Sequence, residues 1–399
     1  MKFSKSNIRK AAIIAVVQAV LLLVLFIYCY DHIKKVIYET DRKNEADLNP
    51  RINDVGLTKI DWNQVKRSNP QPINGGIYLD RISDFDIVRS KWSYEFYAWF
   101  KWDPNKINFI SLKDSVKGAI SVANAPVRIV NGNIEHIETH SFYMNSKRDS
   151  AYILFHITGT TTKFFDVSEY PLDNYLLLIQ VESVDYDIKH AVFIPDSVNS
   201  NVSSRVSVSG FEKDGIAVLS KPHTIKSSLG DPHKALNERN TYSQLRFALL
   251  IKRGGFGIYL KIFITLYIAA LLGFFSFFAA DNDKIRVIVG SLFFAAATLN
   301  IIISRIPAAQ GVSVAEIVND ISLVTILIIA ARETAIKFLF KNNKEIDLLN
   351  KWITFFILFI FYVSINITIP LLCIDSLKQV RFQHKIDLRY IPTVLKNRH

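Results

Sequence analysis

The stretch EHIETH, residues 135–140, contains the residues of this chain that are best suited to acid–base or metal chemistry. Side chains alternate along a β-strand, so His136, Glu138 and His140 are expected on one face. Two imidazoles and a carboxylate on one face could bind a divalent metal ion, or could sense pH near neutrality. The alternative is that they form a solvated strand edge without a ligand.

Sequence signatures of catalysis are not found elsewhere in the chain. The sequence contains no HExxH, GxSxG, P-loop or GxGxxG motif. Cys29 and Cys373 are the two cysteines, which excludes a disulfide framework and a CxxC metal site and leaves at most one mutual disulfide. We therefore expect a protein that is not an enzyme and that needs no cofactor.

The composition indicates a membrane protein. Half of the 399 residues are hydrophobic, and the mean hydropathy is +0.19. The net charge of +12 could suggest a nucleic-acid partner. However, lysine and arginine cluster beside apolar segments rather than along one stripe, which is typical of membrane flanks. We therefore expect the lipid bilayer, and not nucleic acid, as a partner.

Five apolar segments have the length that a membrane-spanning helix needs, which is about 20 residues. They are Ala11–Tyr30, Phe256–Ala280, Ile285–Ile306, Val312–Ala331 and Trp352–Ile374. Basic residues precede the first segment, as in a signal peptide. That segment is long and lacks a small-x-small cleavage site, so we favour an uncleaved signal anchor.

The distribution of positive charge predicts the topology of a multi-pass protein of the cell (inner) membrane. The basic N-terminus and the basic loop after the fourth segment are both expected in the cytoplasm, which places residues 32–255 outside. The basic tail 375–399 then also lies outside, against the same rule. Either one helix is miscounted or the tail lies on the outer lipid surface.

The region before the last four segments has the pattern of a β-domain. In YEFYAWFKW, the residues Tyr94, Phe96, Ala98, Phe100 and Trp102 are expected on one face. Short strands separated by turn signals predict an Ig-like β-sandwich. The expected fold is an α+β membrane protein with a four-helix transmembrane bundle and an N-terminal anchor helix. The expected parts are 1–31 (anchor), 32–71 (stalk), 72–253 (sandwich), 254–374 (four-helix bundle) and 375–399 (tail).

Several motifs follow one another in a specific order. YPLDN at residues 170–174 precedes a leucine-rich strand, Arg253 precedes the second apolar segment, and NDKIRVIVGSLFFAAATLNIIISRIP ends at Pro307. GIYLDRISDFD and YEFYAWFKWD come earlier. Over residues 72–374 this order resembles the pentameric ligand-gated ion channels, the Cys-loop receptor superfamily, in their bacterial form without the cysteines. The resemblance implies a homopentamer in which an outer β-sandwich is coupled to a pore.

The resemblance also implies which helix lines the pore. The acidic-Lys start of 285–306 gives one stripe of expected pore-lining residues: Arg286, Gly290, Phe293, Ala297, Asn300 and Ser304. Phe293 is the expected gate, because five copies would form an apolar constriction; alternatively it is ordinary helix packing. Arg286 and Asp283 are the expected selectivity residues. A ring of arginines favours anions, unless Asp283 pairs with Arg286 or Arg286 extends to the inner interface.

The resemblance further implies a coupling interface and a ligand region. The expected coupling residues are Tyr170, Pro171, Leu172, Asp173, Arg253, Asp84, Asp86 and Pro307. Asp173 is expected to pair with Arg253; alternatively, YPLDN is a plain hairpin turn. The aromatic candidates for ligand binding are Tyr97, Phe142, Tyr143 and Phe211, although aromatics in a sandwich often belong to the core. Glu316 and Asp320 share a helix face and could form a polar seam or a proton-sensitive pair, whereas Glu316 could equally suit the helix start.

The sequence thus predicts a ligand- or proton-gated ion channel, with an unknown small ligand or the proton as its signal. A non-conducting membrane sensor or adaptor on the same scaffold is the first alternative. An assembly or envelope structural protein is the second, and it would predict a stoichiometry other than five.

Overall fold

The computed structural model describes residues 5–49, 65, 67–110, 120–225, 227, 240–306, 311–338 and 344–379. The described chain divides into two compact units. The membrane unit contains the residues up to Thr40, the loop Asp166–Asp173 and the segment Arg253–Gln379. The strand unit contains Asp41–Phe165 and Asn174–Lys252.

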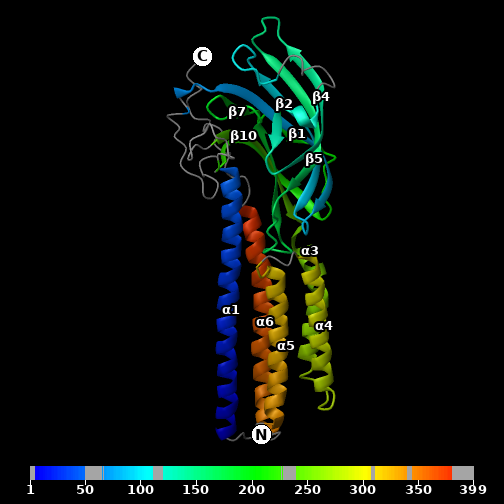
Figure 1. The fold of residues 1–399 in the computed structure, drawn as a ribbon. Coiled ribbons are helices and arrows are strands. Elements are labelled where there is room, and N and C mark those ends of the chain that lie inside the picture. Colours follow the sequence, from blue (N-terminus) through cyan, green and yellow to red (C-terminus); the bar gives the residue numbers. More distant parts are fainter. Residues whose placement is uncertain are drawn as a thin grey trace. The chain divides into compact units, whose positions relative to one another are not determined.

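The membrane unit is helical. Its helices are α1 (Lys5–Leu48), of which the part up to Thr40 belongs to this unit, α3 (Gly255–Phe275), α4 (Lys284–Arg305), α5 (Val314–Phe338) and α6 (Lys344–Gln379). Figure 1 shows α3 to α6 running alongside one another. Within the described residues, five helices are long and apolar enough to cross a membrane, one for each predicted segment. The prediction of a multi-pass membrane protein is therefore supported at this level.

Close contacts between α3, α4 and α5 depend on small residues. Gly273 of α3 faces its neighbours so closely that an added Cβ would lie 3.2 Å from Ile326 Cγ1 of α5 and 3.7 Å from Ser291 Oγ of α4. The buried face of α4 carries the stripe Ile288, Ser291, Ala295, Thr298 and Ile302. Small side chains at such contacts let helix backbones approach, which is the usual packing of helices in lipid.

One face of α1 is buried in the membrane unit. Ala11, Ala15, Leu22, Cys29 and Ile33 recur at helical spacing and are all buried. On the same side, Thr354 Oγ1 of α6 donates a hydrogen bond of 2.9 Å to Gln18 Oε1. The helix continues to Leu48, so the boundary expected between the anchor 1–31 and the stalk 32–71 is not a boundary of secondary structure.

The strand unit contains two sheets, whose strands are bounded as follows: β1 (Gln71–Asp86), β2 (Lys91–Trp102), β3 (Val127–Ile129), β4 (Gly132–Met144), β5 (Ala151–Thr162), β6 (Asn174–Ser183), β7 (Ala191–Pro195), β8 (Asn201–Val202), β9 (Phe211–Ile225) and β10 (Asn240–Arg253). Sheet A has six strands in the order β4-β5-β2-β1-β7, with β8 paired to β1. Sheet B has four strands in the order β3-β6-β10-β9. The chain is therefore of the α+β class, as predicted.

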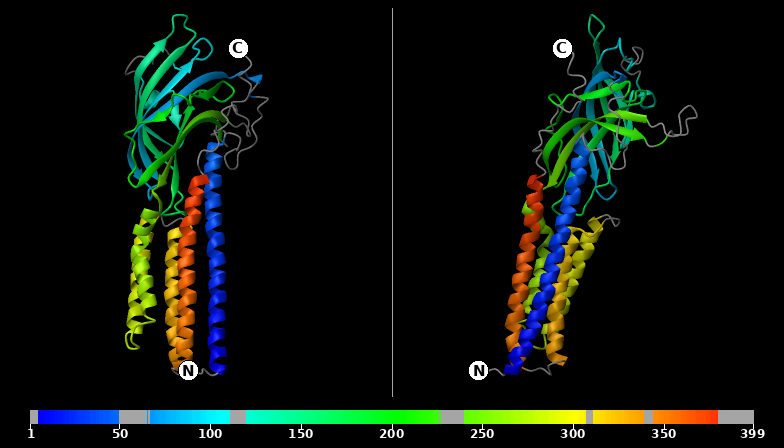
Figure 2. Two further views of the ribbon diagram at one scale, coloured as in Figure 1. Left: turned by 180° about the vertical axis from the view of Figure 1, so that it is seen from behind. Right: turned by 90° about the vertical axis from the view of Figure 1, so that its left-hand side faces the viewer.

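The two sheets share a core, and Figure 2 shows them from two further sides. Tyr94, Phe96, Ala98, Phe100 and Trp102 of β2 are all buried, which confirms the alternation predicted for this strand. An added Cβ at Gly75 of β1 would lie 3.1 Å from both Phe100 Cδ1 and Leu245 Cδ2 of β10. Side chains of sheet A and sheet B therefore meet without an intervening layer.

Strand β6 is buried on both of its faces. One face of β6 lies in the core between the sheets. On the other face, Leu176 and Leu178 belong to an apolar cluster with Ala217, Leu219, Ala248 and Leu250. Leu48, the last residue of α1, packs against this cluster. A strand with cover on both sides has no reason to alternate in polarity.

Candidate functional site

The loop Asp166–Asp173 connects β5 to β6 but belongs to the membrane unit. The amide N–H groups of Val314 and Ala315, at the start of α5, donate to the carbonyl oxygens of Ser168 (2.8 Å) and Tyr170 (3.0 Å). The first four N–H groups of a helix have no partner within the helix. The loop therefore supplies acceptors that α5 needs. This contact explains why a segment between two strands is built into the helical unit.

The apolar residues of the YPLDN turn are buried in that unit. Tyr170, Pro171 and Leu172 are all shielded from solvent. The Arg253 guanidinium lies over the Tyr170 ring, with 5.1 Å between the guanidinium carbon and the ring centroid. These three residues are thus more than a hairpin turn: they are packing residues of the membrane unit.

Asp173 and Arg253 form the expected pair. Arg253 Nε donates to Asp173 Oδ1 at 2.6 Å and Arg253 Nη2 donates to Asp173 Oδ2 at 3.2 Å. The Arg253 amide also donates to the Asp173 carbonyl oxygen at 3.0 Å. The Asp173 side chain is 1% exposed and that of Arg253 is 16% exposed. This bidentate pair fixes the end of the loop to the residue that precedes α3.

Of the remaining predicted coupling residues, Asp84 and Asp86 belong to the strand unit. Asp86 accepts from the amide of Arg89 at 2.9 Å within its own hairpin. Asp84 is exposed. Pro307 lies outside the described residues. Their coupling role stays a prediction.

Glu316 acts at the start of α5. Its Oε2 accepts hydrogen bonds from the Ser313 amide (2.7 Å) and from Ser313 Oγ (2.9 Å). The Glu316 amide in return donates to Ser313 Oγ at 3.2 Å. This is a capping box, so Glu316 has the helix-start role that was the alternative to a polar seam. Asp320, one turn later, is exposed.

The predicted pore stripe lies on the exposed face of α4. Arg286, Phe293, Ala297, Asn300 and Ser304 are exposed, and the side chain of Phe293 is exposed by 74%. A Cβ added at Gly290, the sixth residue of the stripe, would meet no described atom within 4 Å. These residues therefore lie away from the packed face of α4, and their pore-lining role stays a prediction.

Asp283 and Arg286 also form a pair, but in a different setting. Arg286 Nη1 lies 3.4 Å from Asp283 Oδ1, and the two side chains are 83% and 55% exposed. Asp283 is the N-cap residue of α4. A single long contact between exposed groups leaves the Arg286 charge largely available to whatever faces α4.

A second polar cluster of the membrane unit was not predicted. The Arg332 side chain on α5 is 1% exposed. It donates to Asn350 Oδ1 (3.2 Å) and Asp347 Oδ1 (2.5 Å) at the start of α6, and to Glu333. Lys284 at the start of α4 lies 3.6 Å from Glu333. We call Arg332, Glu333, Asp347, Asn350 and Lys284 the inner cluster; it joins α4, α5 and α6.

In the strand unit, His136, Glu138 and His140 all lie on the exposed face of sheet A. Only His136 and Glu138 approach one another, with 3.9 Å between Nε2 and Oε2. His140 instead contacts the Tyr97 ring edge-on, at 5.7 Å between centroids. Among the described residues no group of three or more His, Cys, Asp or Glu has the arrangement of a metal site. The structure thus gives no support to a metal site here.

His156 on β5, which the sequence did not single out, is the centre of this face. Its Nε2 lies 3.0 Å from Glu95 Oε1 on β2, and its Nδ1 lies 3.2 Å from Glu138 Oε1 on β4. The Tyr97 ring lies 4.8 Å from the imidazole. Three strands therefore bring two acids and an aromatic ring to one imidazole.

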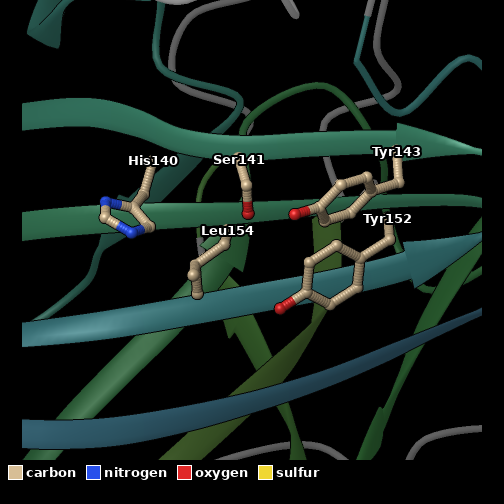
Figure 3. Close-up of a pocket in the computed structure, with 5 residues that line it drawn as sticks. All are labelled: His140, Ser141, Tyr143, Tyr152 and Leu154. Atoms are coloured by element: carbon tan, nitrogen blue, oxygen red, sulfur yellow. The ribbon is translucent and has the colours of Figure 1, made fainter.

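A shallow hollow of about 650 Å³ lies beside it and is lined by His140, Ser141, Tyr143, Tyr152 and Leu154 (Figure 3). The Tyr143 and Tyr152 rings stack at 5.8 Å. A register shift of β4 between Thr139 and Ser141 lets His140 and Ser141 both face the hollow. Burial, with Tyr143 and Asp196, raises the pKa of Tyr152, so its hydroxyl stays a donor.

A second hollow, of about 440 Å³, is lined by Asn74, Tyr78, Trp99, Lys101, Tyr152, Asp196 and Asn199. Trp99 Nε1 donates to Asp196 Oδ2 at 3.1 Å. Burial opposes the ionisation of Asp196, but hydrogen bonds from Asn199 and Trp99 hold its pKa below the ordinary value. A Cβ at Gly76 would lie 2.2 Å from the Trp99 ring, so this close approach needs glycine. The hollow combines aromatic faces with a carboxylate, a setting that suits a small cation.

The other predicted ligand residues lie elsewhere. Phe142 pairs in the ladder with the buried Ile153, so it is directed to the core side of sheet A. Phe211 packs against Phe85 and Tyr175, with ring centroids 5.4 and 5.6 Å apart. Both are packing aromatics, whereas Tyr97 and Tyr143 lie on the exposed face.

The end of α1 is held on the strand unit by three cations. Lys221 Nζ donates to the Ala46 carbonyl oxygen (2.5 Å), and Arg246 Nη1 donates to the Asp47 carbonyl oxygen (3.3 Å). Lys163 Nζ pairs with the Asp47 carboxylate at 3.0 Å. Cations suit the negative end of a helix dipole. We call these residues the α1 clamp.

Comparisons with known proteins add no assignment. No protein-family model matches the sequence, and no curated protein matches it significantly.

Proposed function

We propose that this chain is the subunit of a homopentameric ligand- or proton-gated ion channel of the inner membrane. The observation that carries the proposal is the docking of the loop Asp166–Asp173, with its buried Asp173–Arg253 pair, into the membrane unit. A signal received in the strand unit needs a rigid link to the helices. This loop is the candidate for such a link, because it runs from β5 to β6 while its backbone caps α5.

Three further features support the proposal. The ordered motifs resemble those of the pentameric ligand-gated channels, whose two sheets form an Ig-like β-sandwich. The exposed stripe of α4 is mixed in polarity, as a pore lining in a ring of five copies would be. The positive-inside rule puts the N-terminus in the cytoplasm and residues 32–255 outside.

The signal would act on the exposed face of sheet A. The hollow around Trp99 and Asp196 has a volume in the range of small-molecule sites. Its aromatic faces and carboxylate suit a small organic cation, while Lys101 adds a position for an anionic group on the same molecule.

Recording from the purified full-length protein in planar bilayers tests the proposal. We expect single-channel currents that depend on pH or on an added amine, and particle images with fivefold symmetry. Particles of another stoichiometry would favour a structural or assembly protein. Fivefold particles that stay silent across pH, ions and amines would overturn the channel proposal.

A non-conducting sensor or adaptor is the second candidate, and α1 favours it. This helix is buried along one face in the membrane unit, and its last residues are held by the α1 clamp. Replacing residues 1–31 by a cleavable signal distinguishes the two. A channel core should still assemble and conduct, whereas an adaptor that signals through α1 should lose its output.

A further inference from the structure

His156 is placed between two acids from different strands. Nε2 faces Glu95 at 3.0 Å and Nδ1 faces Glu138 at 3.2 Å, so each ring nitrogen lies within hydrogen-bond distance of a carboxylate. The His156 side chain is only 17% exposed, although it lies on the outer face of sheet A. We call His156, Glu95 and Glu138 the histidine clasp.

The number of donors makes this arrangement depend on a proton. A neutral imidazole carries one N–H and one lone pair, whereas an imidazolium carries two N–H groups. A carboxylate only accepts. A neutral His156 can therefore bond one of the two acids and must turn a lone pair toward the other. The protonated ring satisfies both acids and joins β2, β5 and β4.

The charged and titratable neighbours of the clasp come from every strand around it. On β1, Arg81 lies 3.7 Å from the second oxygen of Glu95. On β2, the face of Tyr97 lies beside the imidazole, at 4.8 Å and 31° between planes. On β4, His136 and His140 flank Glu138. His156 is thus surrounded by an aromatic face, two acids, one arginine and two further histidines.

We propose that His156 is the proton receptor of this protein. When His156 is protonated it bonds both Glu95 and Glu138 and so joins three strands of sheet A, which we call the closed clasp. Deprotonation removes one of the two bonds and opens the clasp. The inference rests on the proposed function in one respect, namely that closing the clasp changes the balance between the open and the closed pore. Protonation supplies the second N–H that the two acids need, so the clasp would respond to acidification. The bonded state is the protonated one, so its stabilisation is present at acid pH and is lost as pH rises.

Two variants of the full-length protein set the clasp in opposite states. His156→Phe keeps a ring beside Tyr97 but removes both hydrogen bonds. Glu138→Gln gives the second partner an amide that can donate to the lone pair of a neutral imidazole, so the clasp closes without a proton. His190→Phe is the control, because His190 pairs with a single acid, Asp187, and its side chain is 70% exposed.

Thermal unfolding in detergent provides a readout that does not depend on conduction. Between about pH 5.5 and pH 8 most carboxylates stay ionised, so the change in stability with pH is compared between proteins that differ only in the clasp. We expect the wild type and His190→Phe to gain stability on acidification. The gain should be smaller in His156→Phe, and in Glu138→Gln the clasp should contribute equally at the two pH values. If His156→Phe gains as much stability on acidification as the wild type does, the proposed clasp is wrong.

Ion flux into vesicles tests the link to the pore. In a conducting protein, Glu138→Gln should conduct at the higher pH as it does at the lower, because its clasp closes without a proton, and His156→Phe should lose most of its response to pH. If the unfolding results hold but no variant conducts at any pH, the clasp stands and the channel proposal falls. If the protein conducts with the same pH profile in His156→Phe, the receptor role of His156 is overturned.

Discussion

The membrane unit contains two aspartate–arginine pairs that differ in almost everything except chemistry. Asp173 and Arg253 are 80 residues apart in sequence, form two hydrogen bonds and expose 1% and 16% of their side chains. Asp283 and Arg286 are three residues apart, approach to 3.4 Å and expose 55% and 83%. The first pair is shielded by the protein and the second faces outward.

The difference decides what each pair can do. Removing one partner of a buried pair leaves an uncompensated charge, which costs about 3–5 kcal/mol. An exposed pair contributes about 0–1 kcal/mol, because solvent screens it. The buried pair is therefore suited to holding two segments in one arrangement. The exposed pair is suited to presenting charge, since little of its field is used within the protein.

The largest expected effect follows from breaking the buried pair. Asp173→Ala should lower the stability of the membrane unit by about 3 kcal/mol and uncouple the signal from opening, while expression is largely retained. A double-mutant cycle with Arg253→Ala, measured by thermal unfolding, should give a coupling energy of about 2 kcal/mol or more. The same cycle with Asp283→Ala and Arg286→Ala is the matched control and should give less than about 0.5 kcal/mol. Equal coupling energies for the two pairs would contradict the view that the buried pair is the stronger one.

The inner cluster tests whether burial, rather than the loop Asp166–Asp173, explains the strength expected for the Asp173–Arg253 pair. Arg332→Met removes the buried cation that serves Asp347 and Glu333. We expect a loss of about 3 kcal/mol in the free energy of unfolding, again because buried acids lose their partner. Lys337→Met, an exposed basic residue of the same helix, should change stability by less than about 0.5 kcal/mol. A small effect of Arg332→Met would show that α5 and α6 are held by apolar contacts alone.

The α1 clamp is an intermediate case, since its cation Lys163 is partly shielded. Burial lowers the pKa of Lys163, an effect that Asp47 partly offsets. A lysine with a lowered pKa binds fewer protons in the folded state. Stability should therefore rise with pH between that lowered value and the ordinary 10.5. Comparing the unfolding temperature at about pH 8 and pH 10 should show a smaller alkaline gain in Lys163→Met than in the wild type.

Asp47→Asn should change the alkaline gain in stability in the opposite direction from Lys163→Met, and it serves as the check. Removing the acid takes away the group that raises the pKa of Lys163, so the alkaline gain should grow. An alkaline gain that is the same in the wild type and both variants would show that Lys163 does not titrate with folding.

The two pairs also show what a sequence can and cannot reveal. YPLDN and Arg253 were predictable because a short motif marks each, and the exposed face of α4 follows from helical spacing. His156 was missed because its two acids lie 18 and 61 residues away, and only strand pairing brings them together. Arg332 could not be singled out, since charge counting does not distinguish a buried arginine from an exposed one. The two-sided burial of β6 was missed because its outer cover comes from α1.

The smallest effect on stability is expected at Arg286, where a specific effect on ion selectivity is expected instead. Arg286→Gln removes an exposed charge whose contact with Asp283 is single and long, so the unfolding temperature should stay within about one degree of the wild type. If the exposed face of α4 lines a pore, the same change removes five charges from its wall, and the reversal potential in a salt gradient should move toward cations. Phe293→Ser tests the same face independently, because a polar residue at the proposed constriction should raise the closed-state leak. A reversal potential that is unchanged in Arg286→Gln, together with a leak that is unchanged in Phe293→Ser, would mean that this face meets lipid or another protein rather than permeating ions.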